Sequence, residues 1–166
     1  ARLARLDEAV AQHERSVAVA READLPQAEC RALSNLGVLY SSSHPQHAIE
    51  ACERGLETAR RIGDLGLQSR LSANLAVAYC TLTNRCDERG VGAAHTAIEI
   101  DRSTGQLDHL AVSLVVLAQI YQCHGEAARA LRHYQEALTL AEKGGEPQLL
   151  FPCYVGLATL YLAVDE

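Results

Sequence analysis

A short pattern recurs four times along the chain at a spacing of about 40 residues. The segments NLGVLY, NLAVAY, VLAQIY and GLATLY each contain a leucine, a small residue directly after it and a tyrosine four positions after the leucine. These marker leucines are Leu36, Leu75, Leu117 and Leu157, so successive copies are 39, 42 and 40 residues apart. Residues four apart lie on one face of a helix, and the small residue lets a neighbouring helix approach closely. A repeat of this length predicts a stack of similar helical units.

A second repeated pattern lies between the markers. The segments 48–64, 90–106 and 130–146 align with one another, and the opening segment 7–24 is a fourth copy. Each has apolar residues at three- and four-residue spacing, as in an amphipathic helix, and each ends in a glycine or polar stop. We call the helices that carry the marker first-type helices and the others second-type helices.

The two patterns together predict an all-α fold, a right-handed α-solenoid of antiparallel helix pairs with about eight helices. Residues 1–166 are expected to form a single array without a linker, because all connections are short. The expected elements are a second-type helix over 4–23, helix pairs over 26–64, 66–105 and 107–145, and a final first-type helix over 147–163. The absence of an initiator methionine indicates a piece of a longer chain.

Composition supports helices and argues against several classes of function. Hydrophobic residues make up 48% of the chain but aromatic residues only 4%, and alanine and leucine, which favour helices, dominate. The net charge of −6 disfavours nucleic-acid binding, and no apolar run approaches the roughly 20 residues that span a bilayer. We therefore expect neither nucleic acid nor membrane as a partner.

The cysteines and histidines offer no constellation for catalysis or metal binding. The six cysteines contain no C-x-x-C pair, and most fall at apolar helical positions, where cysteine packs as a small hydrophobe. His44 and His47 flank Pro45 in a turn, a poor geometry for a metal pair, and the other histidines are scattered. We expect no cofactor, no metal and no enzymatic activity, and the cysteine pattern favours the reducing cytoplasm.

The chain resembles the tetratricopeptide repeat family over essentially its whole length. The third pair follows the family pattern most closely, with the residues Leu117, Ala118, Tyr121, Gly125, Ala130, Tyr134, Ala137 and Leu138. The period near 40 exceeds the usual 34 and is similar to the longer repeats of LGN, rapsyn and kinesin light chain. The first two pairs depart from the pattern, since Cys52 and Ala94 stand where the family has an aromatic residue. The resemblance implies a scaffold that binds proteins in a concave groove lined by first-type helices.

Counting from the marker leucine places candidate groove residues on the first three first-type helices. The residues one and five positions before the marker are Asn35 and Arg31 in the first pair and Asn74 and Arg70 in the second. An asparagine amide matches a peptide group, and an arginine can pair with a carboxylate. The complete predicted groove set is Arg31, Asn35, Val38, Arg70, Asn74, Val77, Val112, Val116 and Gln119, with Ser34, Ala73 and Thr81 nearby.

The arginine and asparagine pattern ends after the second pair. The matching residues are Val112 and Val116 in the third pair, then Pro152 and Gly156, so the groove is expected to become apolar toward the C-terminus. Such a surface favours a partner protein or peptide with an acidic part and a hydrophobic part. Alternatively, the apolar end packs on whatever follows in a longer chain.

Two alternatives stay open from the sequence. Asn35 and Asn74 could instead bond across neighbouring helices and stiffen the array. The whole segment could be a structural spacer or a self-association unit that pairs end to end as a homodimer, because both ends of the array expose a helix face.

Overall fold

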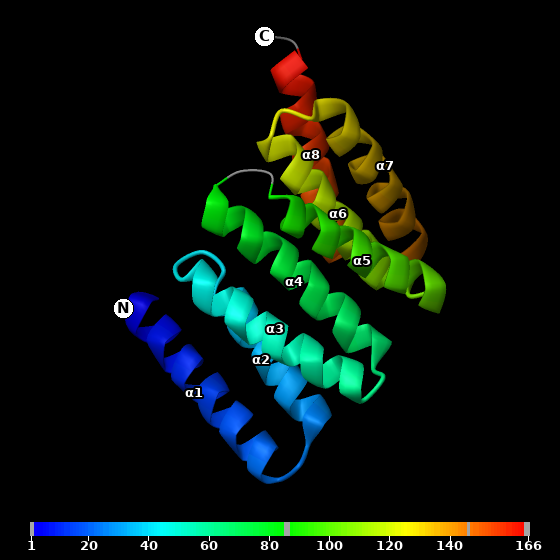
Figure 1. Cartoon of the computed structure of the whole chain (residues 1–166). Coiled ribbons are helices and arrows are strands. Elements are labelled where there is room, and N and C mark those ends of the chain that lie inside the picture. Colours follow the sequence, from blue (N-terminus) through cyan, green and yellow to red (C-terminus); the bar gives the residue numbers. More distant parts are fainter. Residues whose placement is uncertain (1, 85–86, 146, 165–166) are drawn as a thin grey trace.

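Eight α-helices make up the part of the chain described by the computed structural model, which covers residues 2–84, 87–145 and 147–164 (Figure 1). No strand occurs within these residues. The helices are α1 (Arg2–Glu22), α2 (Pro26–Tyr40), α3 (Pro45–Arg61), α4 (Leu65–Thr83), α5 (Glu88–Thr104), α6 (Leu107–Cys123), α7 (Ala127–Gly144) and α8 (Pro147–Val164). The all-α fold predicted from the repeats is confirmed.

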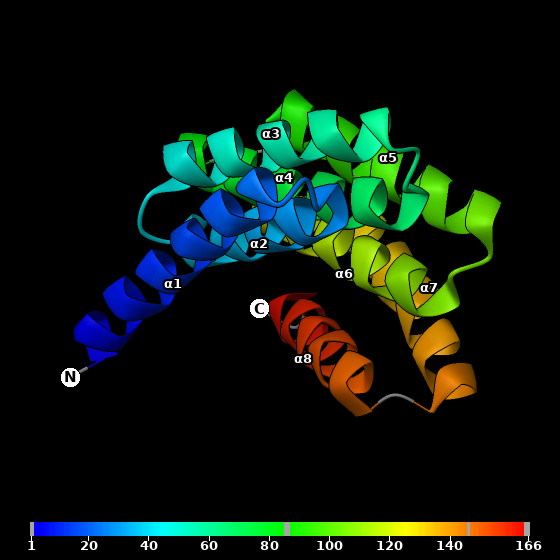
Figure 2. The ribbon, with the colours of Figure 1, turned by 90° about the horizontal axis from the view of Figure 1, so that it is seen from below.

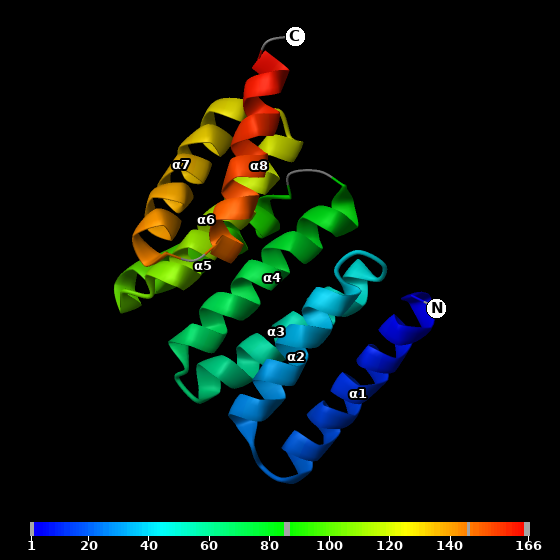
Figure 3. The ribbon, with the colours of Figure 1, turned by 180° about the vertical axis from the view of Figure 1, so that it is seen from behind.

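The helices form an α-solenoid with the two helix types on different sides. The first-type helices α2, α4, α6 and α8 contact one another in succession, and each second-type helix packs against the first-type helices next to it in the chain. Figure 2 shows an arch with α3 and α5 on its outer side, α2, α4 and α6 on its inner side, and α8 beneath it. Figure 3 shows the molecule from the side of the first-type helices.

Local sequence signals explain where the helices begin and end. Pro45 and Pro147 are the first residues of their helices, where a missing N–H costs little. Asp64 caps α4 by accepting a hydrogen bond from the Leu67 N–H at 3.0 Å. Gly105 and Gly145 end α5 and α7 with φ values of 70° and 68°, which glycine adopts without strain, as the predicted stops require.

Small residues are matched to larger ones between neighbouring helices. Gly37 of α2 faces the Cys52 thiol of α3, and an added Cβ at Gly37 would overlap the sulfur. Gly156 of α8 lies against the ring of Tyr134 of α7, and an added Cβ would lie only 2.2–2.6 Å from three ring carbons. Both tight contacts explain why these positions are glycine although glycine weakens an isolated helix.

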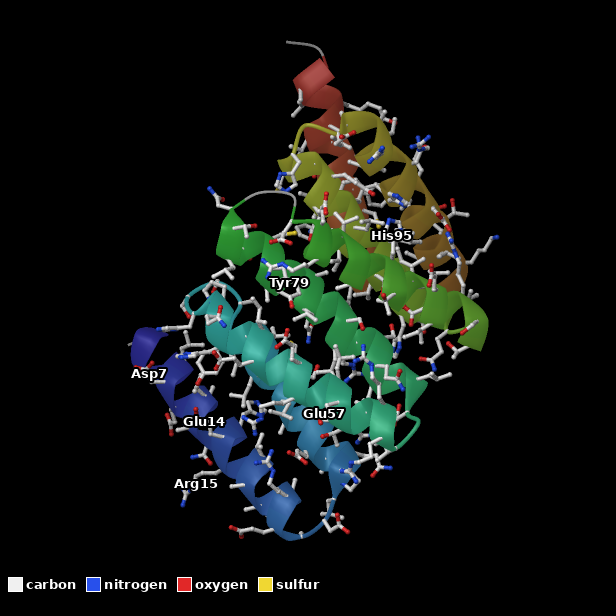
Figure 4. All side chains as sticks on the ribbon, viewed as in Figure 1. Asp7, Glu14, Arg15, Glu57, Tyr79 and His95 are labelled. Carbon is white, nitrogen blue, oxygen red and sulfur yellow. The ribbon has the colours of Figure 1, made fainter. Side chains whose placement is uncertain are left out.

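Two tyrosines tie second-type helices to the first-type helices that follow them. The Tyr40 hydroxyl of α2 donates to Glu14 Oε1 of α1 at 2.9 Å, and the Tyr79 hydroxyl of α4 donates to Glu53 Oε1 of α3 at 2.8 Å. Both pairs are separated by 26 residues in the sequence. The position 26 residues before Tyr121 is His95 of α5, so the third copy lacks the carboxylate (Figure 4).

Candidate functional site

All nine predicted groove residues lie on α2, α4 and α6, and none of them is buried. Six are exposed and three are half-buried, the half-buried ones being Asn74, Val77 and Val116. Two of the valines are exposed although they are large apolar residues: Val38 is 57% exposed and Val112 is 42% exposed. These helices form the inner side of the arch (Figure 2).

Arg31 and Arg70 occupy equivalent positions on neighbouring inner helices. Both side chains are exposed, and within the described part of the chain neither guanidinium makes a hydrogen bond or an ion pair. By contrast, Arg21 of α1 is engaged with Glu29, with its Nε 3.0 Å from Oε1, and Arg102 of α5 bonds to Glu136 at 2.8 Å. The two inner arginines therefore present unneutralised charge toward whatever lies against α2 and α4.

The two asparagines differ although their sequence positions are equivalent. The Asn74 amide nitrogen donates to the Ser34 carbonyl oxygen at 3.1 Å and to Ser34 Oγ at 3.0 Å, so it links α4 to α2. Asn35 is exposed, because no first-type helix precedes α2 in the described chain. Asn74 thus bonds across neighbouring helices, as the alternative expected, whereas the Asn35 amide is exposed to solvent.

Three further positions expected on the inner surface are buried instead. Ser34 is 2% exposed and Ala73 is 6% exposed, because both pack between helices. Gly156 is buried against Tyr134 of α7. The position directly before the marker leucine therefore faces the preceding helix pair, which is why Asn74 reaches α2 and Gly156 reaches α7.

A cavity opens between the C-terminal halves of α4 and α6. Its volume is about 340 Å³. Four of the predicted inner-surface residues line it, namely Val77, Thr81, Val116 and Gln119. The remaining lining residues, which the sequence argument missed, are Cys80, Asn84, Ile120, Cys123 and His124. They follow Val77 and Val116 in successive steps of three or four residues, so continuing the helical periodicity toward the helix ends would have found them.

The cavity differs in charge from the surface that carries the arginines. None of the described residues that line it is an aspartate, glutamate, lysine or arginine. The Thr81 hydroxyl already donates to the Val77 carbonyl oxygen at 2.9 Å within α4. Arg70 and Val77 lie seven residues apart on α4, which corresponds to about 10 Å along the helix axis. A cationic region and an uncharged cavity thus lie next to each other on the inner surface.

The buried polar groups and thiols serve packing. Burial raises the pKa of the Cys52 thiol to about 12 and also raises the pKa values of the Cys30 and Cys153 thiols, so all three stay protonated at neutral pH. Asp101 of α5 is fully buried, and its Oδ2 accepts a hydrogen bond from Ser113 Oγ of α6 at 2.8 Å. Among the described residues, no group of three histidine, cysteine or acidic side chains could hold a metal ion. No described helix is long and apolar enough to cross a bilayer.

The fold and its inner surface define an α-helical repeat protein. The crystal structure of BtubC (BKLC) from P. vanneervenii is similar to the chain, with a TM-score of 0.79 and 22% sequence identity. The match covers 95% of this chain and 66% of the BtubC chain, so the chain spans slightly less than two thirds of that protein. At this identity the likeness concerns the fold. No protein family and no curated protein sequence matches the chain.

Proposed function

We propose that the chain is a tetratricopeptide-type array that binds a segment of a partner protein along α2, α4 and α6. The observation that carries this proposal is the pair of exposed, unpaired arginines, Arg31 and Arg70, at equivalent places on adjacent inner helices. What distinguishes them is their place on first-type helices, because other exposed arginines without a described partner, such as Arg54 of α3 and Arg132 of α7, lie on second-type helices. The segment that fits Arg31 and Arg70 carries carboxylates.

The spacing of the two arginines suits an extended segment. Packed helices lie about 8–10 Å apart, and an extended chain advances about 3.3–3.6 Å per residue. Carboxylates two or three residues apart in the segment can therefore reach Arg31 and Arg70 together. The outward-facing amide of Asn35 adds a donor and an acceptor for the segment's backbone.

Charge reversal at the two arginines tests the proposal. The probe is a fluorescein-labelled peptide of glycine and serine with two glutamates separated by one residue, measured by fluorescence anisotropy at low salt. The double variant Arg31→Glu with Arg70→Glu is expected to weaken binding by about tenfold or more, because two weak attractions become repulsions. Asn74 is left intact, since replacing it would break the link between α4 and α2.

The matched control reverses two arginines on second-type helices, Arg54 of α3 and Arg132 of α7, which are also exposed. This variant has the same net charge as the test variant but keeps the inner surface unchanged. Equal loss of affinity in both variants would show a general charge effect and contradict the proposed site. Binding of the wild type should also weaken as salt rises.

A second candidate function is self-association within a larger assembly, and α8 favours it. Five large apolar side chains of α8 are more than 45% exposed, namely Phe151, Tyr154, Val155, Tyr161 and Leu162. A contiguous apolar surface of this kind marks a contact site more often than a solvated surface. Dependence of the molecular mass on protein concentration tests this candidate.

We further propose that the protein acts in the cytoplasm. The support is the use of Cys30, Cys52 and Cys153 as fully buried, protonated packing residues, which suits a compartment where thiols stay reduced.

A further inference from the structure

We infer that the cavity between α4 and α6 receives one large apolar side chain of the bound segment, and that this side chain follows or precedes an arginine-bound carboxylate by about three to five residues. The inference rests on the proposed function and adds a sequence rule for the partner. It depends on the chemistry, size and position of the cavity.

The cavity is chemically suited to an apolar group. Val77, Val116 and Ile120 supply apolar side chains from two helices, and no aspartate, glutamate, lysine or arginine is among the described residues that line the cavity. The Thr81 hydroxyl is already bonded within its own helix, so a side chain entering beside it leaves that hydroxyl satisfied. An acidic or basic side chain placed here would lose hydration and would meet no aspartate, glutamate, lysine or arginine among the described lining residues.

The size of the cavity accommodates one large apolar side chain. Its volume of about 340 Å³ lies at the lower end of the range for small-molecule pockets. The cavity is also open to the inner surface, so the backbone of the segment can pass over it while one side chain enters. The exposed Gln119 amide at its edge offers a donor and an acceptor to a peptide group.

The position of the cavity sets the spacing. Arg70 is seven residues before Val77 and eleven before Thr81 on α4, which places the cavity about 10–17 Å from Arg70 along the helix. An extended segment covers that distance in about three to five residues. A segment in which the carboxylate and the apolar residue are adjacent could reach Arg70 or the cavity, but not both.

A peptide panel measures this rule. The peptides share a glycine and serine background with two glutamates, and one leucine is placed from one to eight residues away on either side. We expect leucine at three to five residues on one side to tighten binding to the full chain by about ten- to hundredfold relative to serine at the same place. Leucine at the other spacings is expected to change the binding affinity little.

Filling the cavity provides the second arm. Thr81→Trp on α4 and, independently, Cys123→Trp on α6 should abolish the gain from leucine while leaving the affinity for the leucine-free peptide unchanged. Val19→Trp is the matched control, because Val19 is exposed on α1, outside the predicted groove, and does not line the cavity. Circular dichroism confirms that each variant keeps its helices.

The outcomes separate this inference from the proposed function. If leucine gives no gain at any spacing, or if the gain survives in both cavity-filling variants, the inference is wrong although acidic peptides still bind. If the leucine-free peptide binds equally well to the Arg31→Glu, Arg70→Glu variant, the proposed function is wrong, and the spacing rule fails with it.

Discussion

At the scale of single residues, Gly156 and Tyr134 form the contact that joins the last two helices. Tyr134 is 1% exposed, and its hydroxyl donates to Gln122 Oε1 of α6 at 2.8 Å. The ring therefore cannot turn away from α8 without losing this hydrogen bond. Since Gly156 lies directly against the ring, the backbone of α8 approaches α7 only as closely as a glycine allows.

Gly156→Ala is expected to lower the free energy of unfolding by about 1–3 kcal/mol, because the added methyl group overlaps the Tyr134 ring. This loss exceeds the gain of about 0.5–1 kcal/mol that alanine brings to a helix interior. Urea denaturation measures the change, and hydrogen exchange should show faster opening of α8 than of α4.

Gly92→Ala is the matched control on α5. Gly92 is exposed, and nothing lies within 4 Å of a Cβ added there. Its substitution should stabilise the protein by about 0.5–1 kcal/mol. The tight contact in α8 would be disproved if both alanine variants were stabilised alike.

The contacts of individual side chains were the feature of the site that the sequence predicted least well. Asn35 and Asn74 occupy the same place in the repeat, yet only Asn74 has a first-type helix before it to bond with. Gly156 was expected to face the groove, but a bulky Tyr134 from α7 covers it. A repeat pattern shows which positions are equivalent, whereas the size of the neighbour that each copy meets depends on residues 20–40 positions away in the chain.

At the scale of helices, hydrogen bonds between tyrosine and glutamate connect the repeats. Burial, together with the hydrogen bond to Glu53, raises the pKa of Tyr79, and the Arg89 guanidinium lies 4.5 Å from the centre of the same ring. The phenol therefore stays a donor across the physiological pH range. Each such bond holds a second-type helix to the next first-type helix where their backbones separate.

Tyr79→Phe is expected to lower the free energy of unfolding by about 0.5–1 kcal/mol, since the bond to Glu53 is exposed and competes with water. Tyr161→Phe should change it by less than this amount, because Tyr161 is 54% exposed and its hydroxyl has no hydrogen-bond partner in the described chain. A double-mutant cycle of Tyr79→Phe with Glu53→Ala measures the coupling by urea denaturation. Strictly additive effects would contradict a direct bond.

Helix identity was predictable because several signals agree at each boundary. The marker pattern has helical spacing, prolines stand at helix starts, and Gly105 and Gly145 stand at helix ends. The cavity between α4 and α6 was predicted only in part, since the sequence supplied Val77, Thr81, Val116 and Gln119 but not the depth between them. Depth depends on how far two helices separate, which the pattern of a single helix does not encode.

At the scale of the whole molecule, the two ends of the array differ in chemistry. From Pro147 to Val164, α8 contains no charged residue, and the positions 40 residues earlier on α6, such as Leu114 and Val115, are buried. The exposed face of α8 is thus the face that is covered in the other repeats. In contrast, the exposed side chains of α1 are mostly polar, and Val19 is the large apolar exception among those described.

This difference changes the expected form of self-association. End-to-end pairing would place the apolar face of α8 against the charged side chains of α1, which would lose hydration without matched partners. Pairing of α8 with α8 of a second copy joins two uncharged faces by a two-fold axis, so no charged side chain of α8 has to be buried at the contact. We therefore expect a symmetric dimer through α8 if the chain self-associates.

The double variant Phe151→Glu with Leu162→Glu should convert this dimer to a monomer in sedimentation-equilibrium experiments over a concentration series. Phe151 is 73% exposed and Leu162 is 70% exposed, so the substitutions add charge at the contact without disturbing buried packing. The matched control is Val19→Glu with Val38→Glu, which adds the same charge at exposed valines of α1 and α2 and should leave the dimer intact. A wild-type chain that sediments as a monomer at every concentration would show that α8 does not bind a second copy. Dissociation of the control variant would instead indicate general charge repulsion, because neither valine lies on α8.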